Sequence, residues 1–411
     1  MSKRVVVIGA GAAGLFSGGI AAEAGAEVVI LEKNASPGRK LNITGKGRCN
    51  VTNNCDFDEL MANVPQNPRF MYSAMSSFSP QDMMQFLERM GVALKTERGA
   101  RVFPVSDNAK DVTDALVSFC RKNGAKIKKG EAVGIIEKDG EICGVKTRDG
   151  EIPCDSVIVA TGGASYPLTG STGDGYKFAE SVGHTVREPK ASLVALEGEA
   201  KLCRSAQGLT LKNVSLSAYS QKGKCIFSEL GEMLFTHFGI SGPLVLSASA
   251  HMRNFEKESY CVTIDLKPGL SPEKLEARIL RDIEEKKNKD MVNLLRGLLP
   301  SGIIPMVLEK AGIDKDVKGN SLTREMRRSL RDTLKALKIE ISGKRPIEEA
   351  IITSGGVDVK EINPKTMESK IVKGLYFAGE VLDVDAYTGG FNLQIAWSSA
   401  FAAGKSAAEE E

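Results

Sequence analysis

The most constraining feature of this chain is a glycine-rich turn between an apolar run and a helix near its N-terminus. The run Val5–Ile8 leads into Gly9-Ala10-Gly11-Ala12-Ala13-Gly14, and a second run, Ala26–Leu31, ends on Glu32. This spacing is that of a dinucleotide-binding βαβ unit. The first glycine permits the tight turn, the second lets a pyrophosphate approach the helix N-terminus, and the third permits close packing of helix on strand.

The acid that ends the second run indicates which nucleotide binds. Glu32 is placed to accept hydrogen bonds from the ribose hydroxyls of an adenosine, which favours FAD or NAD(H) over NADP(H). The uncharged stretch from Val5 to Ala22 contains five glycines, so it lacks the continuous apolar segment of a signal peptide.

The overall composition limits which binding partners and which cellular compartment are expected for this chain. The 411 residues carry a net charge of +3, which is too small to indicate nucleic acid or an anionic membrane as the main partner. Eight cysteines without metal-type spacing, in a chain with no export signal, predict reduced thiols and a cytoplasmic location. The three histidines also lack metal-ligand spacing, so we predict no metal.

The order of predicted helices and strands along the chain indicates a cofactor domain that is divided by an insertion. Residues 1–188 and 340–411 are expected to form a Rossmann-like FAD-binding domain, residues 189–270 an inserted β-rich domain, and residues 271–339 a small helical subdomain. We expect a long polar loop over residues 33–56 and helices that start near Pro80 and Asn108. Two Asp-Gly turns after Glu131 predict a three-stranded meander, an insertion typical of FAD-binding variants of the Rossmann fold.

A second cofactor contact is expected near the C-terminus. The apolar run Leu375–Ala378 precedes Gly379-Glu380, Asp383 and a Gly389-Gly390 pair that opens a predicted helix. Carboxylates here are placed to bind ribitol or phosphate-side hydroxyls. The helix N-terminus can direct N–H groups at the flavin edge, where negative charge grows on reduction.

The basic segment Gly38–Asn50 is the third candidate contact. Its four cations can balance a diphosphate or polarise a flavin, although a solvated basic loop has the same composition.

Cys49 and Cys55 leave open a minor alternative, a dithiol mechanism like that of flavin disulfide reductases, although five residues separate the two cysteines. His237, in a segment rich in glycine, is the candidate acid/base, and a structural histidine is an equally good interpretation.

Taken together, these stretches resemble a known family, the aminoacetone-oxidase-like or BaiN-like FAD-dependent oxidoreductases. The matching stretches are Gly9–Gly14, Gly38–Lys40, Gly47–Asn50, Arg101–Pro104, Ala160–Gly163, Thr169–Gly175, Leu234–Pro243, Lys365–Lys370, Ala378–Glu380 and Gly389–Gln394. The resemblance implies non-covalent FAD in a split α/β Rossmann-like domain. It also implies either amine oxidation or reduction of conjugated double bonds. Ala386 and Phe391 depart from the family pattern, in which glycine and tyrosine are usual.

The predicted function is therefore hydride transfer between flavin N5 and a small organic substrate, with NAD(P)H as a possible transient donor. The oligomeric state does not follow from the sequence. The alternative from another class is a flavin-binding regulatory protein without turnover, with basic residues between 324 and 338 as its partner surface. The predicted FAD contacts are Gly9, Gly11, Ala12, Ala13, Gly14, Glu32, Lys33, Arg39, Lys40, Thr44, Gly45, Gly47, Arg48, Cys49, Asn50, Val133, Thr161, Gly162, Gly379, Glu380, Asp383, Gly390, Phe391, Asn392 and Leu393.

Overall fold

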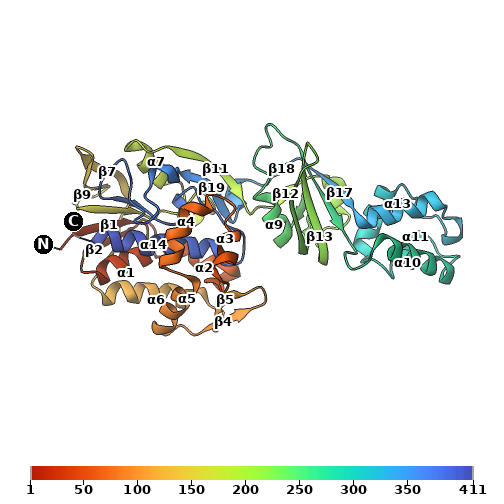
Figure 1. Cartoon of the computed structure of the whole chain (residues 1–411), viewed down its shortest axis with the longest axis horizontal. Helices are drawn as coiled ribbons and strands as arrows, with labels where there is room; N and C mark the ends of the chain where they lie inside the picture. The colour runs from red at the N-terminus through yellow and green to blue at the C-terminus, as the bar shows by residue number, and fades with distance from the viewer. Residues whose placement is uncertain (1, 410–411) are drawn as a thin grey trace. The chain divides into compact units, whose positions relative to one another are not determined.

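The computed structural model describes residues 2–409, which divide into two compact units (Figure 1). Unit 1 runs to Ser192 and resumes at Ile347, whereas unit 2 spans Leu193–Pro346. Unit 1 is thus assembled from two segments that are far apart in the sequence.

A five-stranded parallel sheet forms the centre of unit 1, in the order β20-β10-β1-β2-β6. Val5–Ile8 is buried, as expected for a parallel strand covered on both faces. This sheet, together with the antiparallel sheets of the chain, confirms the predicted α/β class with a Rossmann-like core. The strands are β1 (Arg4–Ile8), β2 (Glu27–Glu32), β6 (Lys126–Lys129), β10 (Ser156–Val159) and β20 (Leu375–Phe377).

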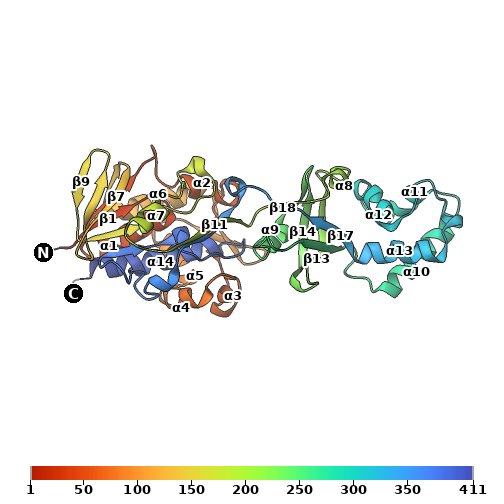
Figure 2. The same cartoon turned by 90° about the horizontal axis from the view of Figure 1, so that it is seen from above.

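Three helices pack together beside this sheet: α1 (Ala12–Glu23), α6 (Ala109–Lys122) and α14 (Phe391–Ala408). The first and the last lie side by side in both views, although almost the whole chain separates them (Figures 1 and 2). The buried ring of Phe16 joins them, because it contacts the rings of both Phe119 and Trp397.

Several locally predicted elements are present. Helix α5 (Pro80–Arg89) begins with a capping box between Ser79 and Asp82. Helix α6 begins after Asn108, whose side chain accepts a hydrogen bond from the N–H of Lys110. The meander is the sheet of β7 (Ala132–Lys138), β8 (Glu141–Thr147) and β9 (Gly150–Pro153).

The expectation of a loop over residues 33–56 is wrong. Helix α2 (Arg39–Gly47) occupies its centre and β3 (Thr52–Asn53) its end. The helix follows Gly38, which has left-handed backbone angles, and it is anchored by buried Leu41. Non-helical angles from Thr44 to Lys46 kink it, which explains why no continuous helical pattern is visible in the sequence.

The remaining elements of unit 1 surround this core. They are α3 (Phe57–Ala62), α4 (Pro68–Ser77), β4 (Leu94–Glu97), β5 (Arg101–Pro104), α7 (Asp174–Ser181), β11 (Val186–Ser192) and β19 (Ile352–Val357).

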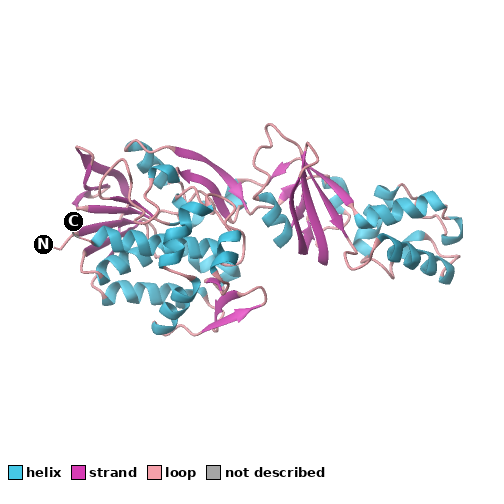
Figure 3. Ribbon diagram, viewed as in Figure 1, coloured by secondary structure: helices cyan, strands magenta, loops and turns pink. Residues whose placement is uncertain are grey.

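Unit 2 combines a seven-stranded sheet with helices (Figure 3). Buried residues of the strands and of the helices form one hydrophobic cluster, so the division expected at residue 270 falls inside a shared core. The strands are β12 (Leu196–Glu197), β13 (Thr210–Ser220), β14 (Cys225–Phe235), β15 (Gly239–Ser241), β16 (Tyr260–Asp265), β17 (Leu337–Ile341) and β18 (Gly343–Lys344). The helices are α8 (Ala200–Arg204), α9 (Pro243–Ser249), α10 (Pro272–Glu285), α11 (Met291–Leu295), α12 (Ile304–Ala311) and α13 (Arg324–Lys335). Within residues 2–409, no helix has the length and apolar character needed to cross a membrane.

A buried histidine ties the end of α7 to the C-terminal segment of unit 1. The Nδ1 atom of His184 lies 3.1 Å from Glu361, and its Nε2 atom lies 2.7 Å from the hydroxyl of Ser369. The ring also packs edge-on against Phe377 of β20. Burial lowers the pKa of His184, and Glu361 offsets this effect only in part.

This histidine makes stability depend on pH. The unfolded chain, in which histidine has a pKa of about 6.5, binds a proton more readily than the native state. The free energy of unfolding of unit 1 should therefore fall as the pH decreases through about 6.5, by up to about 1.4 kcal/mol per unit of lowered pKa. Urea unfolding between about pH 7.5 and pH 5.5 measures this slope. His184→Gln should flatten it, and an unchanged slope in this variant would show that other groups are responsible.

Candidate cofactor site

The glycine-rich turn has the geometry that each of its glycines predicts. Gly9 has φ +102°, and a Cβ atom there would lie 2.7 Å from the carbonyl oxygen of Ala160. A Cβ on Gly14 would lie 1.8 Å from the carbonyl oxygen of Gly9, so α1 packs directly against the turn that follows β1. A Cβ on Gly11 would meet no atom within 4 Å. The open space at the N-terminus of α1 therefore lies where a pyrophosphate needs it.

The acid at the end of β2 is held in place by the turn itself. One carboxylate oxygen of Glu32 accepts the N–H of Ala10 at 3.0 Å. The other accepts the N–H and the side-chain amide of Asn34 at 2.8 and 2.7 Å. A carboxylate oxygen can accept more than one hydrogen bond, so ribose hydroxyls can still bind. Nearby, the N–H of Gly130 donates to the carbonyl oxygen of Glu32, and Val133 remains 45 % exposed three residues further on.

The C-terminal segment lies against this turn. A Cβ on Gly379 (φ +79°) would lie 2.9 Å from Cβ of Ala13, the second residue of α1. A Cβ on Gly390 (φ +102°), the N-cap of α14, would lie 2.4 Å from the backbone of Thr52. The structure thus brings both predicted glycine sites into one unit, as a single cofactor requires. Leu393 follows in the first turn of α14, after Phe391.

An ion pair links α2 to this C-terminal segment. The ammonium group of Lys40 lies 2.7 Å from the carboxylate of Glu380 and 2.7 Å from the hydroxyl of Ser165. Glu380 also accepts the N–H of Thr353 at 2.9 Å and the hydroxyl of Ser165 at 3.1 Å. Ser165 and Thr353 are network members that sequence reasoning missed. The serine lies only two residues beyond Gly163, within a stretch already singled out, whereas no local pattern marks the threonine.

Two buried acceptors that need partners lie in and just before β3, which follows α2. The side-chain oxygen of Asn50 is buried and makes no hydrogen bond, and the same is true of Asn53. Buried polar atoms usually have partners, so this pair fits a bound group with N–H or O–H donors, which a flavin ring provides. The Thr44 hydroxyl, by contrast, donates to the carbonyl oxygen of Leu41 at 2.7 Å. Gly45 and Gly47 both have positive φ and shape the kink.

Other predicted contacts are engaged within the protein. Arg48 pairs with Glu97 at 2.9 Å and lies over the ring of Phe103 at 4.0 Å. Lys33 pairs with Asp174 at 2.5 Å, and Arg39 donates to Asn34 at 3.0 Å. The interactions of Lys33 and Arg39 position the segment that follows Glu32, and direct contact of these cations with FAD stays a prediction.

Two polar residues of the C-terminal segment act as internal clamps. Asp383 is buried and accepts hydrogen bonds from the side chains of Gln66 and Asn67. Asn392 bonds to both the N–H and the carbonyl oxygen of Ala386, which fixes the loop before α14. A further predicted contact lies outside the C-terminal segment, in the loop that follows β10. A Cβ on Gly162 (φ +74°) would lie 2.9 Å from the Ser171 hydroxyl, so Thr161 and Gly162 begin a tightly packed loop.

The cysteine alternative is not favoured by the surroundings of the two thiols. Both Cys49 and Cys55 are free and buried. Burial raises the pKa of Cys49 to about 12 and that of Cys55 to about 11. Because the thiolate is the reactive form, neither thiol is poised for exchange near neutral pH. Within the described residues, no cluster of three or more His, Cys, Asp or Glu side chains is arranged to hold a metal ion.

His237 lies in unit 2, in the turn between β14 and β15. The N–H of Thr236 donates to the carbonyl oxygen of Gly239 and closes this turn. The imidazole is exposed and packs edge-on against Phe238, with ring centroids 5.0 Å apart. Its role in acid/base chemistry stays a prediction.

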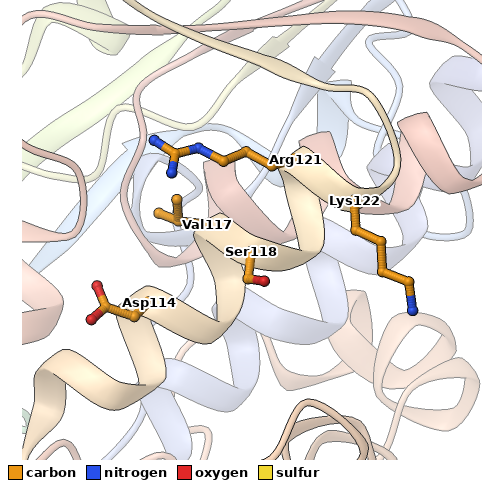
Figure 4. A pocket seen from close by; sticks show the side chains of 5 residues that line it. All are labelled: Asp114, Val117, Ser118, Arg121 and Lys122. Carbon is orange, nitrogen blue, oxygen red and sulfur yellow. The ribbon is translucent and has the colours of Figure 1, made fainter.

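One surface depression lies apart from all these residues (Figure 4). All the residues that line it belong to α6: Asp114, Val117, Ser118, Arg121 and Lys122. Since none of the predicted FAD contacts takes part, this depression is not part of the candidate cofactor site.

Comparison with known protein families identifies the family of this chain. The model of the HI0933-like protein Rossmann domain matches residues 3–406. The chain belongs to this family. It is an FAD-dependent oxidoreductase.

Three similar proteins illustrate the range of the family and its fold. The chain is 34 % identical to the ribosomal RNA dihydrouridine synthase of Escherichia coli, covering 97 % of this chain and 96 % of that one. It is 30 % identical to the 3-dehydro-bile acid delta(4,6)-reductase of Clostridium scindens, covering 99 % of each. In fold it is similar to a 3-ketosteroid-delta4-(5alpha)-dehydrogenase from Rhodococcus jostii, with a TM-score of 0.51, 15 % identity, and 99 % and 97 % of the two chains covered.

Two glycine substitutions separate cofactor binding from folding. Gly11→Ala has open space and an ordinary φ, so the apoprotein should keep its thermal stability while its affinity for FAD falls at least about tenfold, or ~1.4 kcal/mol. Gly14→Ala places a methyl group on the Gly9 carbonyl and should destabilise the apoprotein by about 1–3 kcal/mol. Flavin released per protein and melting of the apoproteins measure the two effects. Equal loss of stability in both variants would contradict the assignment of Gly11.

Proposed function

We propose that this enzyme reduces a carbon–carbon double bond conjugated to a carbonyl, and that its substrate is uridine in ribosomal RNA. The names of the two curated relatives carry this proposal. Dihydrouridine forms when the C5=C6 bond of uracil, conjugated to the C4 carbonyl, is saturated. A 3-oxo bile acid with double bonds at positions 4 and 6 presents the same kind of acceptor. The shared chemistry favours reduction over amine oxidation.

The distribution of charge supports RNA as the substrate. Unit 2 carries 26 Lys and Arg against 19 Asp and Glu, a formal charge of +7, whereas the rest of the chain carries 29 against 33, a charge of −4. The expectation of no nucleic-acid partner came from the net charge of the whole chain, in which these opposite values cancel. Because ribosomes lie in the cytoplasm, a ribosomal RNA substrate also supports a cytoplasmic location.

The residues described above have defined roles in this proposal. The N-terminus of α1 at Gly11 holds the pyrophosphate of FAD, and Glu32 holds its adenosine ribose. Bound FAD supplies a hydride for the carbon β to the carbonyl, with NAD(P)H as the proposed source of electrons. The α carbon then requires a proton, and His237 is the proposed donor.

The regulatory alternative loses its main support in the structure. Of the basic residues proposed as a partner surface, four are in ion pairs inside unit 2. Arg327 and Arg331 both pair with Glu276, Lys335 pairs with Asp265, and Lys338 pairs with Glu340.

The proposal predicts a defined product. Anaerobic mixing with NADH or NADPH should bleach the bound flavin, and the reduced enzyme should convert uridine in unmodified ribosomal RNA to dihydrouridine. Mass spectrometry of RNA digests detects the gain of two hydrogens per modified uridine. Rapid flavin reduction by amines, with reoxidation by O₂ and unchanged RNA, would instead show an amine oxidase.

The proton donor can be tested separately. His237→Gln should lower kcat for reduction of the double bond by about 10²–10⁴-fold. FAD content and flavin bleaching by NAD(P)H should stay at the level of the parent protein, because neither needs that proton. A variant with unchanged kcat would remove His237 from the reaction and leave the flavin assignment intact.

A further inference from the structure

One stretch of unit 2 is basic without any acidic counterpart. Residues 200–228 contain five Lys and Arg and no Asp or Glu, and they form α8, β13 and the start of β14. Lys212, Lys222 and Lys224 of this stretch are exposed. In α13, by contrast, most of the cations are neutralised by neighbouring carboxylates. Lys212, Lys222 and Lys224 lie on β13 and in the turn that follows it, whereas the two acids of the hairpin, Glu229 and Glu232, lie on β14.

The hairpin has one covered face and one open face. On the covered face, Leu216 and Ala218 are buried, and a Cβ on Gly231 would lie 3.1 Å from the side chain of Leu244 in α9. Alternation along the strand directs Ser215, Ser217 and Tyr219 to the opposite face.

The open face is solvent-accessible and polar. Ser215 pairs with Leu230 of β14, whose side chain is 64 % exposed. Ser217 pairs with Ser228, and their hydroxyls lie 2.8 Å apart. Tyr219 lies further along the same strand and is partly exposed.

Lysines stand at both ends of this face. Lys212 precedes the serines, while Lys222 and Lys224 lie in the turn that joins the two strands. Eight strand residues separate Lys212 from the end of β13 at Ser220, roughly 26 Å at the usual rise of a strand, and Lys222 lies in the turn beyond it. A single nucleic-acid strand laid along the face can place phosphates against both ends and stack bases on Tyr219 and Leu230 between them.

We infer that the open face of the β13–β14 hairpin binds a single-stranded segment of RNA. This inference rests on the proposed function and deepens it, since it assigns recognition of the polyanion to a surface of unit 2. Hydroxyls of Ser215, Ser217 and Ser228 can bond to the sugar 2′-OH or to base edges, which are exposed in unpaired RNA and not in a duplex groove.

Charge reversal tests this surface in the full-length flavoprotein. The triple variant Lys212→Glu, Lys222→Glu, Lys224→Glu should bind a fluorescein-labelled, uridine-rich single-stranded RNA at least tenfold more weakly than the parent. The slope of log Kd against log salt should fall by about 2, because each lost phosphate contact removes about 0.7. Fluorescence anisotropy at several salt concentrations gives both values.

A matched control separates a local site from general electrostatics. Lys274→Glu, Lys287→Glu, Lys289→Glu makes the same change in net charge at exposed positions in and just after α10. The control should bind RNA within about twofold of the parent. Tyr219→Ala should weaken binding of the single strand about fivefold or more, corresponding to about 1–3 kcal/mol per stacked base, and should affect a duplex of the same sequence less.

The outcomes distinguish this inference from the proposed function. Equal weakening by the two triple variants, or no binding of RNA by the parent protein, would overturn the hairpin as an RNA site. Dihydrouridine formation that continues at full rate in the hairpin variant would likewise overturn it, while leaving the proposed reaction established. Thermal melting like that of the parent shows that each variant is folded, because unit 2 has a hydrophobic core of its own.

Discussion

The structure of unit 1 depends on close packing around α1, which small residues make possible. A Cβ on Gly18 would lie 2.6 Å from Ile30 of β2, and one on Gly19 would lie 2.4 Å from Phe119 of α6. On α14, a Cβ at Gly404 would lie 2.4 Å from the carbonyl oxygen of Ser17. The helix is therefore enclosed by elements from both chain segments. A methyl group at Gly404 would meet the backbone of α1, so the two helices would have to move apart, whereas at Gly18 and Gly19 the side chains of Ile30 and Phe119 would have to move.

Polar interactions then fix what packing brings together. Glu32 bonds back to the turn through Ala10, and Lys40 joins α2 to Glu380 on the C-terminal segment. The Lys40–Glu380 pair is only partly exposed, so solvent screens it less than a surface ion pair. These contacts fix the rim of the candidate cofactor site, and a rim that is already fixed reduces the ordering that binding itself must supply.

Charge is divided between the two units, and this division bears on substrate choice. An acidic unit 1 and a basic unit 2 give a nearly neutral chain. The family has kept one cofactor fold for relatives named for an RNA base and for a bile acid, which shows that substrate preference does not follow from the Rossmann sheet. The proposed proton donor His237 and the proposed RNA-binding hairpin both belong to the inserted unit 2.

The amino-acid sequence by itself determined the βαβ turn, the nucleotide class, the capped helices at Pro80 and Ala109, and the two glycine sites. Each depends on residues close together in the chain, whose backbone preferences and spacing are readable locally. Only the tertiary structure decided that Thr353 and Ser165 share Glu380 with Lys40, that Arg48 pairs with Glu97, and that residues 39–47 form a kinked helix. These outcomes depend on partners tens to hundreds of residues away, and no local pattern records which distant side chain the fold will bring within hydrogen-bonding distance.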